Sequence, residues 1–391
     1  MTIYDSRMKH LQTALREQQL AAFIVTHNVD IYYLTGTMQS GLLLVPAAAE
    51  PTFYVRRSIT RARDESAVRV EELGSLKTLG ARAAERYPEL SGAVPIALTY
   101  DVLPVEWFDR LRAAFPDAQW HNASAIIREA RMVKDPEELE AMRKAARIAD
   151  DTLRQAVRGI RPGMTEIELL ADIEYMLRKA GHLGLMRVRA MNMELVTGIA
   201  ASGASAAIPS AFDGPAGGEG LHSAFPKGAG FSPILPGEPI LLDIGCNIEG
   251  YVTDQTRTAV IGELDEELQA AYDASEAILA RIERELKPGA ICEDIYEVAL
   301  EMAARSGFGD HFMGYKGDAV KFVGHGIGLE IDEWPVLAKG FRTPLRPGMV
   351  VAIEPKFTFK DRGVVGIENT YAITESGFER LTLTPPGLIR L

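Results

Sequence analysis

Four acidic residues and one histidine stand where their side chains could share a metal ion. Asp243 and Asp254 lie eleven positions apart in the β-branched segment ILLDIGCNIEGYVTDQTRT. Glu354 and Glu368 each follow a run of apolar residues, in MVVAIEPKF and GVVGIENTYAIT, and His325 stands among glycines in VGHGIGLEIDEWP. A lone aspartate in a turn is usually solvated, but a buried carboxylate is costly unless it is paired or bound to a cation.

Four carboxylates in one buried site would repel one another and titrate upward unless a cation lay among them. Two aspartates, two glutamates and one histidine offer mostly hard oxygen donors and one imidazole. This set suits divalent first-row ions such as Mn²⁺, Co²⁺, Fe²⁺ or Zn²⁺. Two such ions about 3.5–4 Å apart can share a hydroxide and clamp a tetrahedral intermediate. The five residues therefore predict a hydrolase with two divalent metal ions.

The local sequence indicates how these side chains are positioned. The odd separation of Asp243 and Asp254 would place them on opposite faces of one continuous strand. Gly250 between them favours a hairpin or bulge, which can turn both carboxylates to one place. The glycines on either side of His325 are expected to leave room for metal and substrate to approach this ligand closely.

The first third of the chain alternates short strand-like and helix-like segments, which predicts an α/β domain over residues 1–130. The segments are AAFIVT, GLLLVP and TFYVRR as strands, and RMKHLQTALREQQ and VEWFDRLRAAF as helices. Beyond this domain, Asp135, Pro136 and Glu138 form the start signal of a helix with a capping box. The apolar stripe of that helix is Leu139, Met142, Ala146, Ala149 and Leu153.

The remaining residues, 131–391, contain an internal repeat. RPGMTEIELLADIEYMLRKAG (161–181) aligns without a gap with KPGAICEDIYEVALEMAARSG (287–307), at an offset of 126 residues. Each reads as a turn, an amphipathic helix and a glycine stop, and each follows another predicted helix. Two amphipathic helices can also look alike by chance. We favour a duplicated, pseudo-symmetric α+β domain.

The ordered set Asp, Asp, His, Glu, Glu resembles the pita-bread metallopeptidase family, through the phrases DIG…YVTDQTRT, GHGIG, IEP and GIENT. The family includes methionine aminopeptidase, aminopeptidase P, prolidase and creatinase. The segment NVDIYYLTG (28–36) resembles the N-terminal domain of the last three. The resemblance implies a pita-bread domain over 131–391 and a homodimer in which the N-terminal domain helps to wall the neighbour's site. It also implies five metal ligands, which are Asp243, Asp254, His325, Glu354 and Glu368.

The chain departs from the family at two histidines outside the metal ligands. Seven residues after His325, the family phrase HE-x-P reads DEWP, with Asp332 in the histidine slot, and the family phrase PHG reads PKG, with Lys227. Lys227 and Asp332 could form an ion pair across the site. Alternatively, Lys227 binds an anionic group or an oxyanion and Asp332 acts as a base. They could also be exposed loop residues, with another donor such as His222 in their place.

Three classes of function follow. The first is an Xaa-Pro peptidase of the aminopeptidase P or prolidase type, in which Glu354 carries a proton to the leaving amine. The second is a non-peptidase enzyme on the same fold, a C–N hydrolase or lyase acting on a small zwitterion, suggested by Lys227 and Asp332. The third is a binding protein on an inactive scaffold, which the retention of all five ligands disfavours.

Composition limits partners and location. The 391 residues carry a formal net charge of −12, which gives no electrostatic reason to bind nucleic acid or an anionic membrane. The only two cysteines, Cys246 and Cys292, favour a reducing cytosol over a disulfide framework. The first twenty residues have no apolar signal region, and no run approaches the length of a membrane helix. We expect a cytoplasmic protein with a small peptide or other small molecule as substrate.

Overall fold

A computed structural model describes residues 2–391 and divides the chain into two compact units, Met1–Arg131 and Met132–Leu391. The sequence predicts the division between residues 130 and 131. Across residues 2–391, no helix has both the length and the apolar character required of a membrane span.

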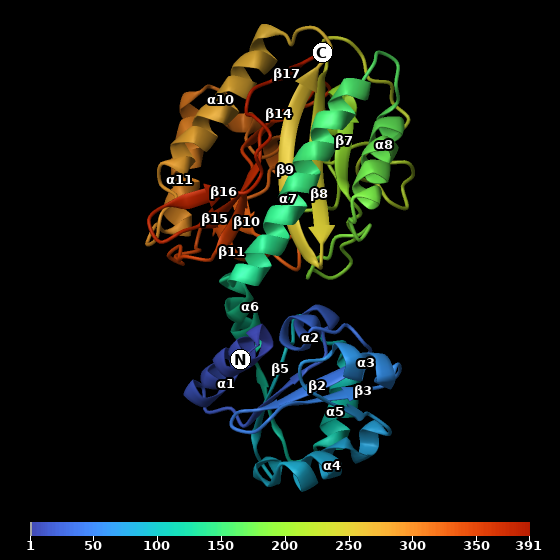
Figure 1. The fold of residues 1–391 in the computed structure, drawn as a ribbon. Helices are drawn as coiled ribbons and strands as arrows, with labels where there is room; N and C mark the ends of the chain where they lie inside the picture. Colours follow the sequence, from blue (N-terminus) through green and yellow to red (C-terminus); the bar gives the residue numbers. More distant parts are fainter. Residues whose placement is uncertain (1) are drawn as a thin grey trace. The chain divides into compact units, whose positions relative to one another are not determined.

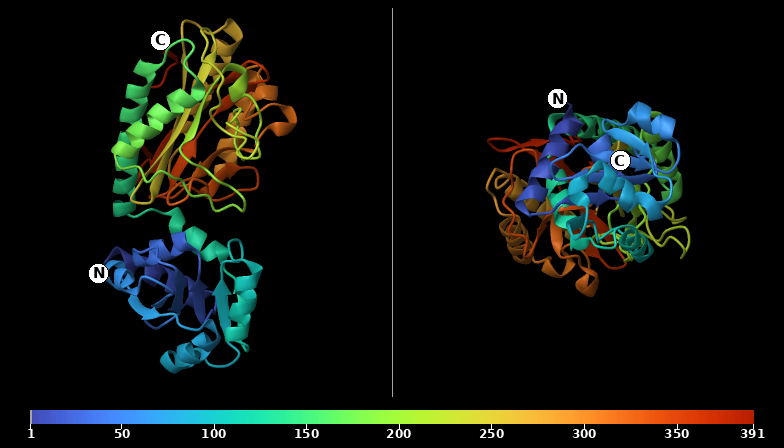
Figure 2. Two further views of the ribbon diagram at one scale, coloured as in Figure 1. Left: turned by 90° about the vertical axis from the view of Figure 1, so that its right-hand side faces the viewer. Right: turned by 90° about the horizontal axis from the view of Figure 1, so that it is seen from below.

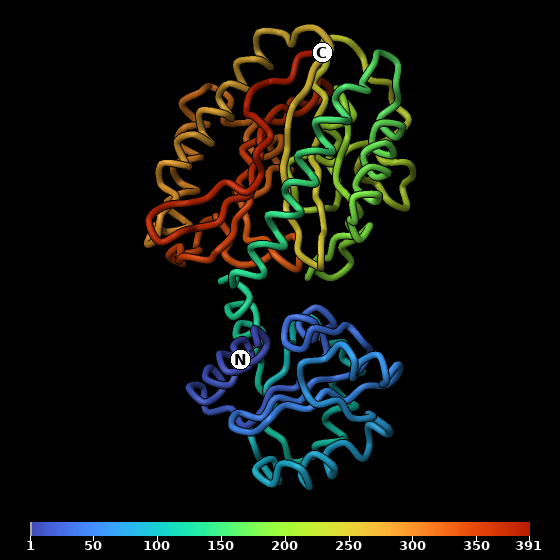
Figure 3. The backbone as a smooth tube through the Cα atoms, viewed as in Figure 1, coloured from blue at the N-terminus to red at the C-terminus, as the bar shows by residue number. Residues whose placement is uncertain are grey.

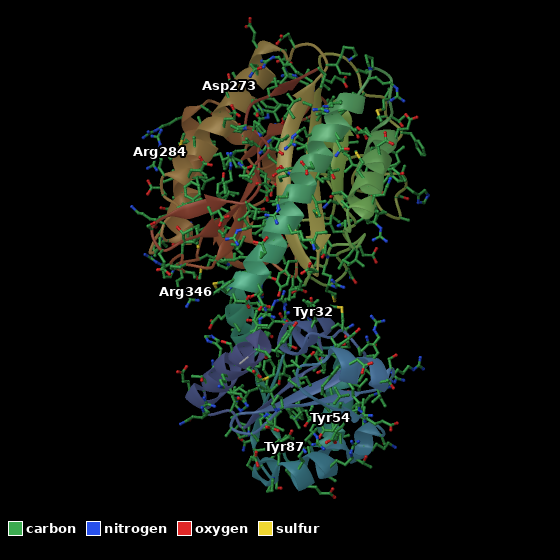
Figure 4. The ribbon with its side chains drawn as sticks, viewed as in Figure 1. Tyr32, Tyr54, Tyr87, Asp273, Arg284 and Arg346 are labelled. Carbon is green, nitrogen blue, oxygen red and sulfur yellow. The ribbon has the colours of Figure 1, made fainter. Side chains whose placement is uncertain are left out.

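The first unit is an α/β domain around a six-stranded sheet in the order β4-β3-β2-β1-β5-β6. Its elements are α1 (Ile3–Glu17), β1 (Ala22–Val25), α2 (Asn28–Thr35), β2 (Gly41–Pro46), β3 (Thr52–Val55), α3 (Ile59–Glu65), β4 (Arg69–Glu72), η1 (Leu76–Thr78), α4 (Leu79–Arg86), η2 (Pro88–Leu90), β5 (Pro95–Leu98), α5 (Val105–Ala114), β6 (Gln119–Asn122) and α6 (Ser124–Met132). Tyr54 on β3 and Tyr87 after α4 are both buried in its core (Figure 4).

The second unit holds two helix pairs and three sheets. Its helices are α7 (Pro136–Ala156), η3 (Val157–Gly159), α8 (Glu166–Lys179), α9 (Gly203–Ala206), α10 (Glu266–Glu283), α11 (Cys292–Arg305), η4 (Gly309–His311) and η5 (Lys316–Asp318). Its strands are β7 (Gly198–Ser202), β8 (Pro239–Ile248), β9 (Tyr251–Val260), β10 (Phe322–Gly326), β11 (Glu333–Ala338), β12 (Val350–Ile353), β13 (Lys356–Phe359), β14 (Gly363–Gly366), β15 (Asn369–Ile373), β16 (Phe378–Arg380) and β17 (Ile389–Arg390).

Helix α7 begins as the sequence predicts. The Asp135 side chain accepts hydrogen bonds from the backbone N–H groups of residues 137 and 138, and the Glu138 side chain accepts from the Asp135 N–H, so the capping box is complete. The predicted stripe faces the core, where Ala149 and Leu153 pack with Leu242 of β8. Figure 1 shows α7 crossing the long β8–β9 hairpin.

The internal repeat is confirmed in the positions of its helices. Helices α8 and α11 begin 126 residues apart, at Glu166 and Cys292, and also end 126 residues apart, at Lys179 and Arg305. Helices α7 and α8 lie on one side of the strands, and α10 and α11 on the other (Figures 1 and 2). The second unit is therefore a duplicated α+β domain.

The sheets lie between these helix pairs. One sheet has the order β17-β9-β8-β7, a second has the order β11-β10-β12-β15-β16, and β13 pairs with β14. The chain end returns beside β9, where Ile389 pairs in parallel with Ala259 (Figure 3). The hairpin β8–β9 and the second sheet carry the predicted ligands.

Candidate metal centre

The β8–β9 hairpin presents the two aspartates on one face. A two-residue turn joins the strands, and its second residue, Gly250, has a φ of 93°, which glycine adopts without strain. Asp243 pairs with Thr256, which lies two residues beyond Asp254 along β9. Because alternate residues of a strand share a face, both carboxylates project from the same side of the hairpin. The predicted hairpin is confirmed.

His325 lies on β10, between β11 and β12. A Cβ at Gly324 would lie 2.3 Å from the carbonyl oxygen of Ala352, and one at Gly326 would lie 2.2 Å from the carbonyl oxygen of Trp334. These glycines therefore let two neighbouring strands approach the strand that carries the histidine. The expectation that they leave room for metal and substrate is wrong, because backbone of the protein itself fills that space.

The two glutamates lie side by side where β12 ends and β15 begins. Ile353 pairs with Asn369, so Glu354 and Glu368 flank the last pair of this ladder. The Glu368 N–H donates to the Thr256 carbonyl oxygen at 3.1 Å, and Thr256 Oγ1 donates to Glu368 Oε2 at 2.7 Å. These contacts join the second sheet to the β8–β9 hairpin and so bring the glutamates to the aspartates.

All five predicted ligands line one small cavity of about 50 Å³. Ligand atoms of Asp254, His325 and Glu368 lie within 4.8 Å of one another. Asp254 Oδ1 and Glu368 Oε1 are buried there without a hydrogen-bond partner. Because buried polar atoms are normally satisfied, these two oxygens indicate a place for a cation, and the donor set fits a divalent ion.

A residue that the sequence analysis did not single out, Lys356, lies among the same acids. Its Nζ donates to Glu354 Oε2 at 2.7 Å, to Glu368 Oε2 at 2.8 Å and to Asp243 Oδ2 at 3.2 Å. The side chain is fully buried. The available signal was a lysine two residues after Glu354, in a segment that continues an apolar run, because lysine is rarely buried unless it is paired.

The buried carboxylates of the site have too little positive charge around them to offset their mutual repulsion. Burial raises the pKa of Asp254 well above its usual value, and the carboxylates of Glu368 and Asp243 raise it further. Burial also raises the pKa of Glu354 to about 7, although Lys356 acts in the opposite direction. Burial alone would lower the pKa of Lys356, but the three acids that it contacts hold this pKa well above its usual value. The cluster would therefore accept a further cation.

Asp332 contacts the histidine rather than the lysine. His325 Nδ1 lies 3.5 Å from Asp332 Oδ1 and 3.1 Å from the carbonyl oxygen of Gly326, while Nε2 lies 3.7 Å from Glu354 Oε1. The Nδ1 side of the ring thus faces two acceptors, which leaves Nε2 directed at the acids. A carboxylate in this place fixes the orientation of a metal-binding imidazole.

Lys227 also lines the cavity, where its Nζ lies 2.8 Å from the centre of the Phe212 ring. Burial lowers the pKa of Lys227 to about 7, with Asp243 first among the acids that oppose this shift. Among the described residues, no ion pair joins Lys227 to Asp332, so that hypothesis is wrong. The two side chains share the cavity but have different partners.

His222 does not reach the site. Its side chain is exposed, its Nδ1 accepts a hydrogen bond from the Ala224 N–H at 3.1 Å, and it does not line the cavity. The structure does not bring His222 to the cavity of the five predicted ligands, because the turn at residues 222–225 holds the ring in a local contact.

A larger cavity of about 1020 Å³ adjoins the cluster and shares Phe212, Asp213 and Phe322 with it. Its other walls come from residues 207–217 and 314–321 and from Val336, Ala338, Thr358 and Lys360. Burial raises the pKa of Asp213, and the charge of Asp332 adds to this effect. The sequence analysis missed Asp213, which stands in the turn-like phrase FDGP. The cavity offers room for a small peptide beside the acids.

Comparison with known proteins agrees with this geometry. Residues 140–375 match metallopeptidase family M24, and residues 7–133 match the creatinase/prolidase N-terminal domain. The chain belongs to metallopeptidase family M24. The predictions of a pita-bread fold with a creatinase-type N-terminal domain, and of a metallopeptidase-type hydrolase, are thereby confirmed.

Relatives of this M24 chain include Xaa-Pro dipeptidases. One from Pyrococcus horikoshii is 26% identical over 392 residues, which is 100% of both chains. One from Lactobacillus helveticus is 30% identical over 294 residues, or 75% of this chain and 71% of the relative. The crystal structure of the prolidase from Pyrococcus horikoshii OT3 superposes with a TM-score of 0.81 at 26% identity and covers 98% of this chain and 100% of its own.

Proposed function

We propose that this M24 member is a divalent-metal-dependent Xaa-Pro peptidase, and that dipeptides of the Xaa-Pro type are its first candidate substrates. The observation that carries this proposal is the convergence of five ligand side chains on one cavity, with two buried carboxylate oxygens that have no partner. The full-length similarity to Xaa-Pro dipeptidases supports the substrate class.

Asp254, His325 and Glu368 would hold a divalent ion at this cavity, with Glu354 beside them. Such an ion supplies Lewis acidity toward the scissile carbonyl. Glu354 stands beside the cluster as the group that carries a proton to the leaving amine. Asp332 holds the His325 ring in place through Nδ1.

Lys227 is the proposed donor to the developing oxyanion. Its ammonium group lines the same cavity, and it replaces the family histidine as a point charge. Asp332 then serves as a positioning residue, and the earlier hypothesis that it acts as a base has no contact in its favour beyond His325.

Several finer predictions belong with this proposal. The ion could be Mn²⁺, Co²⁺, Fe²⁺ or Zn²⁺. The count of two ions stays a prediction, and the position of Lys356 among the acids is relevant to it. The homodimer also stays a prediction. A cytoplasmic location is supported by the free, buried state of Cys246 and Cys292.

The non-peptidase alternative is not favoured, because the relatives named above are Xaa-Pro dipeptidases. The inactive-scaffold alternative does not explain the two unpartnered oxygens. Both alternatives remain outcomes of the same experiment.

The test is hydrolysis of Ala-Pro, of Xaa-Pro-Xaa tripeptides and of small zwitterions, each after addition of Mn²⁺ or Co²⁺. We expect cleavage of the Xaa-Pro bond, loss of activity in EDTA and loss in Asp254→Asn. The matched control Asp361→Asn alters an exposed loop aspartate and should retain activity. Turnover of zwitterions alone, or no turnover of any substrate by the metal-loaded protein, would contradict the proposal.

A further inference from the structure

The acid cluster already contains one cation of its own. The Lys356 ammonium has three N–H groups, and three carboxylate oxygens lie at 2.7, 2.8 and 3.2 Å from its nitrogen. Its donors are therefore all used by the residues predicted to hold metal. The ammonium group of a lysine is compact and can act as a point charge in such a site.

The surrounding backbone is shaped for this lysine. Lys356 pairs with Gly366 across β13 and β14. A Cβ at Gly366 would lie 2.6 Å from Lys356 Cγ, so a larger residue there would displace the lysine stem. The side chain has no exposed surface. The lysine is thus an integral, buried member of the acid cluster and not a surface side chain.

The three acids bound by Lys356 are not the whole set. Asp254 Oδ1 and Glu368 Oε1 keep no partner, and Asp254, His325 and Glu368 form the group whose ligand atoms lie within 4.8 Å of one another. Asp243 lies outside that group and contacts the lysine instead. The cluster therefore separates into a part occupied by the ammonium and a part open to one ion.

We propose that Lys356 takes the place of one of the two predicted metal ions, so that the chain binds a single divalent ion through Asp254, His325 and Glu368, with Glu354 beside them. A second divalent ion would have to displace the ammonium from oxygens of Asp243 and Glu368. If the ammonium stayed in place, the ion and the ammonium would be close neighbours and would repel each other strongly.

This inference rests on the proposed metal-dependent function. Its test measures the number of bound ions per chain and does not require catalytic activity. The purified full chain is stripped with EDTA, equilibrated with excess Mn²⁺ or Co²⁺, freed of unbound metal and analysed for ions per chain. Titration calorimetry gives the same stoichiometry in solution. We expect one ion per chain in the wild type.

Substitution of the lysine should open the second position. Lys356→Met retains the length and apolar stem of the side chain and removes the charge, and we expect its count to rise from one to two. Lys360→Met, which alters an exposed lysine just after the same strand, should stay at one. Asp243→Asn in the wild-type background should retain the single ion, whereas Asp254→Asn should lose it.

Each outcome bears on the inference. Two ions or none in the wild-type chain would overturn it, and so would a count that stays at one in folded Lys356→Met. If Lys356→Met does not fold, the wild-type count and the contrast between Asp243→Asn and Asp254→Asn decide the matter. One ion with no Xaa-Pro cleavage would overturn the proposed function alone, while two ions with cleavage would overturn only this inference.

Discussion

Asp332 Oδ1 lies 3.5 Å from His325 Nδ1, on the side of the imidazole ring opposite the acids. The aspartate that departs from the family sequence therefore contacts the predicted ligand His325 and not Lys227. The pKa of His325 reflects this setting, because burial lowers it but Asp332, Glu354 and Glu368 together raise it above its usual value. We propose that Asp332 orients the ring.

Asp332→Asn is expected to weaken metal binding by about 10-fold, the lower end of the effect of losing a partner of a metal-bound histidine. The amide keeps the shape of the side chain but loses the negative charge that faces Nδ1. Calorimetric titration with Mn²⁺ measures the change. Asp361→Asn is the control, and an unchanged affinity in Asp332→Asn would show that the contact does not support the ligand.

Lys356→Met is expected to destabilise the metal-free protein by about 3–5 kcal/mol, because removal of one partner leaves buried carboxylates uncompensated. Urea unfolding in EDTA measures this loss. Excess Mn²⁺ should restore more stability to the variant than to the wild type, since bound ions stabilise the folded state by mass action. Equal stability of the two metal-free proteins would argue against a structural role for the ammonium.

Lys227→Met is expected to lower kcat by about 10²–10³-fold if the ammonium stabilises an oxyanion. The metal count should remain that of the wild type, because Lys227 contacts the Phe212 ring and, among residues 2–391, its Nζ donates no hydrogen bond to the five predicted metal ligands. Steady-state kinetics on Ala-Pro separates kcat from KM. A rise in KM with an unchanged kcat would instead assign Lys227 to binding of the substrate.

His182 gives a pH dependence of stability away from the metal site. It is buried after α8, and its Nδ1 accepts a hydrogen bond from the Asn247 N–H at 2.9 Å. Burial, with a smaller effect of Arg178, lowers its pKa from 6.5 to about 4. The unfolded chain therefore binds the proton more readily than the folded chain between these values. The stability that this histidine contributes is complete above pH 6.5 and is lost as the pH falls toward 4.

His182→Asn retains an acceptor for the Asn247 N–H but cannot take up the proton. Between pH 7 and pH 5, the variant should lose about 2 kcal/mol less stability than the wild type. Urea unfolding at both pH values, in EDTA, gives the difference. His10→Gln changes an exposed histidine and should follow the wild type; parallel losses in all three proteins would rule out the expected effect of His182.

Local sequence was enough for much of the architecture. Helix periodicity, the capping box at Asp135 and the repeat at an offset of 126 residues predicted α7, α8 and α11, because these signals depend on neighbours within a few residues. The same holds for the hairpin that joins Asp243 to Asp254. The residue types of the five ligands also identified the chemistry, since acids within apolar runs require a cation.

The tertiary structure alone decided which cation serves which acid. Lys356 is 113 positions from Asp243, and Thr256 is 112 positions from Glu368, so no local pattern relates them. Packing of the hairpin against the second sheet placed an ammonium among carboxylates, and it left His222 in a local turn outside the site. The sequence by itself determined that the acids need positive charge. How that charge is divided between lysine and metal depends on distances that only the folded chain sets.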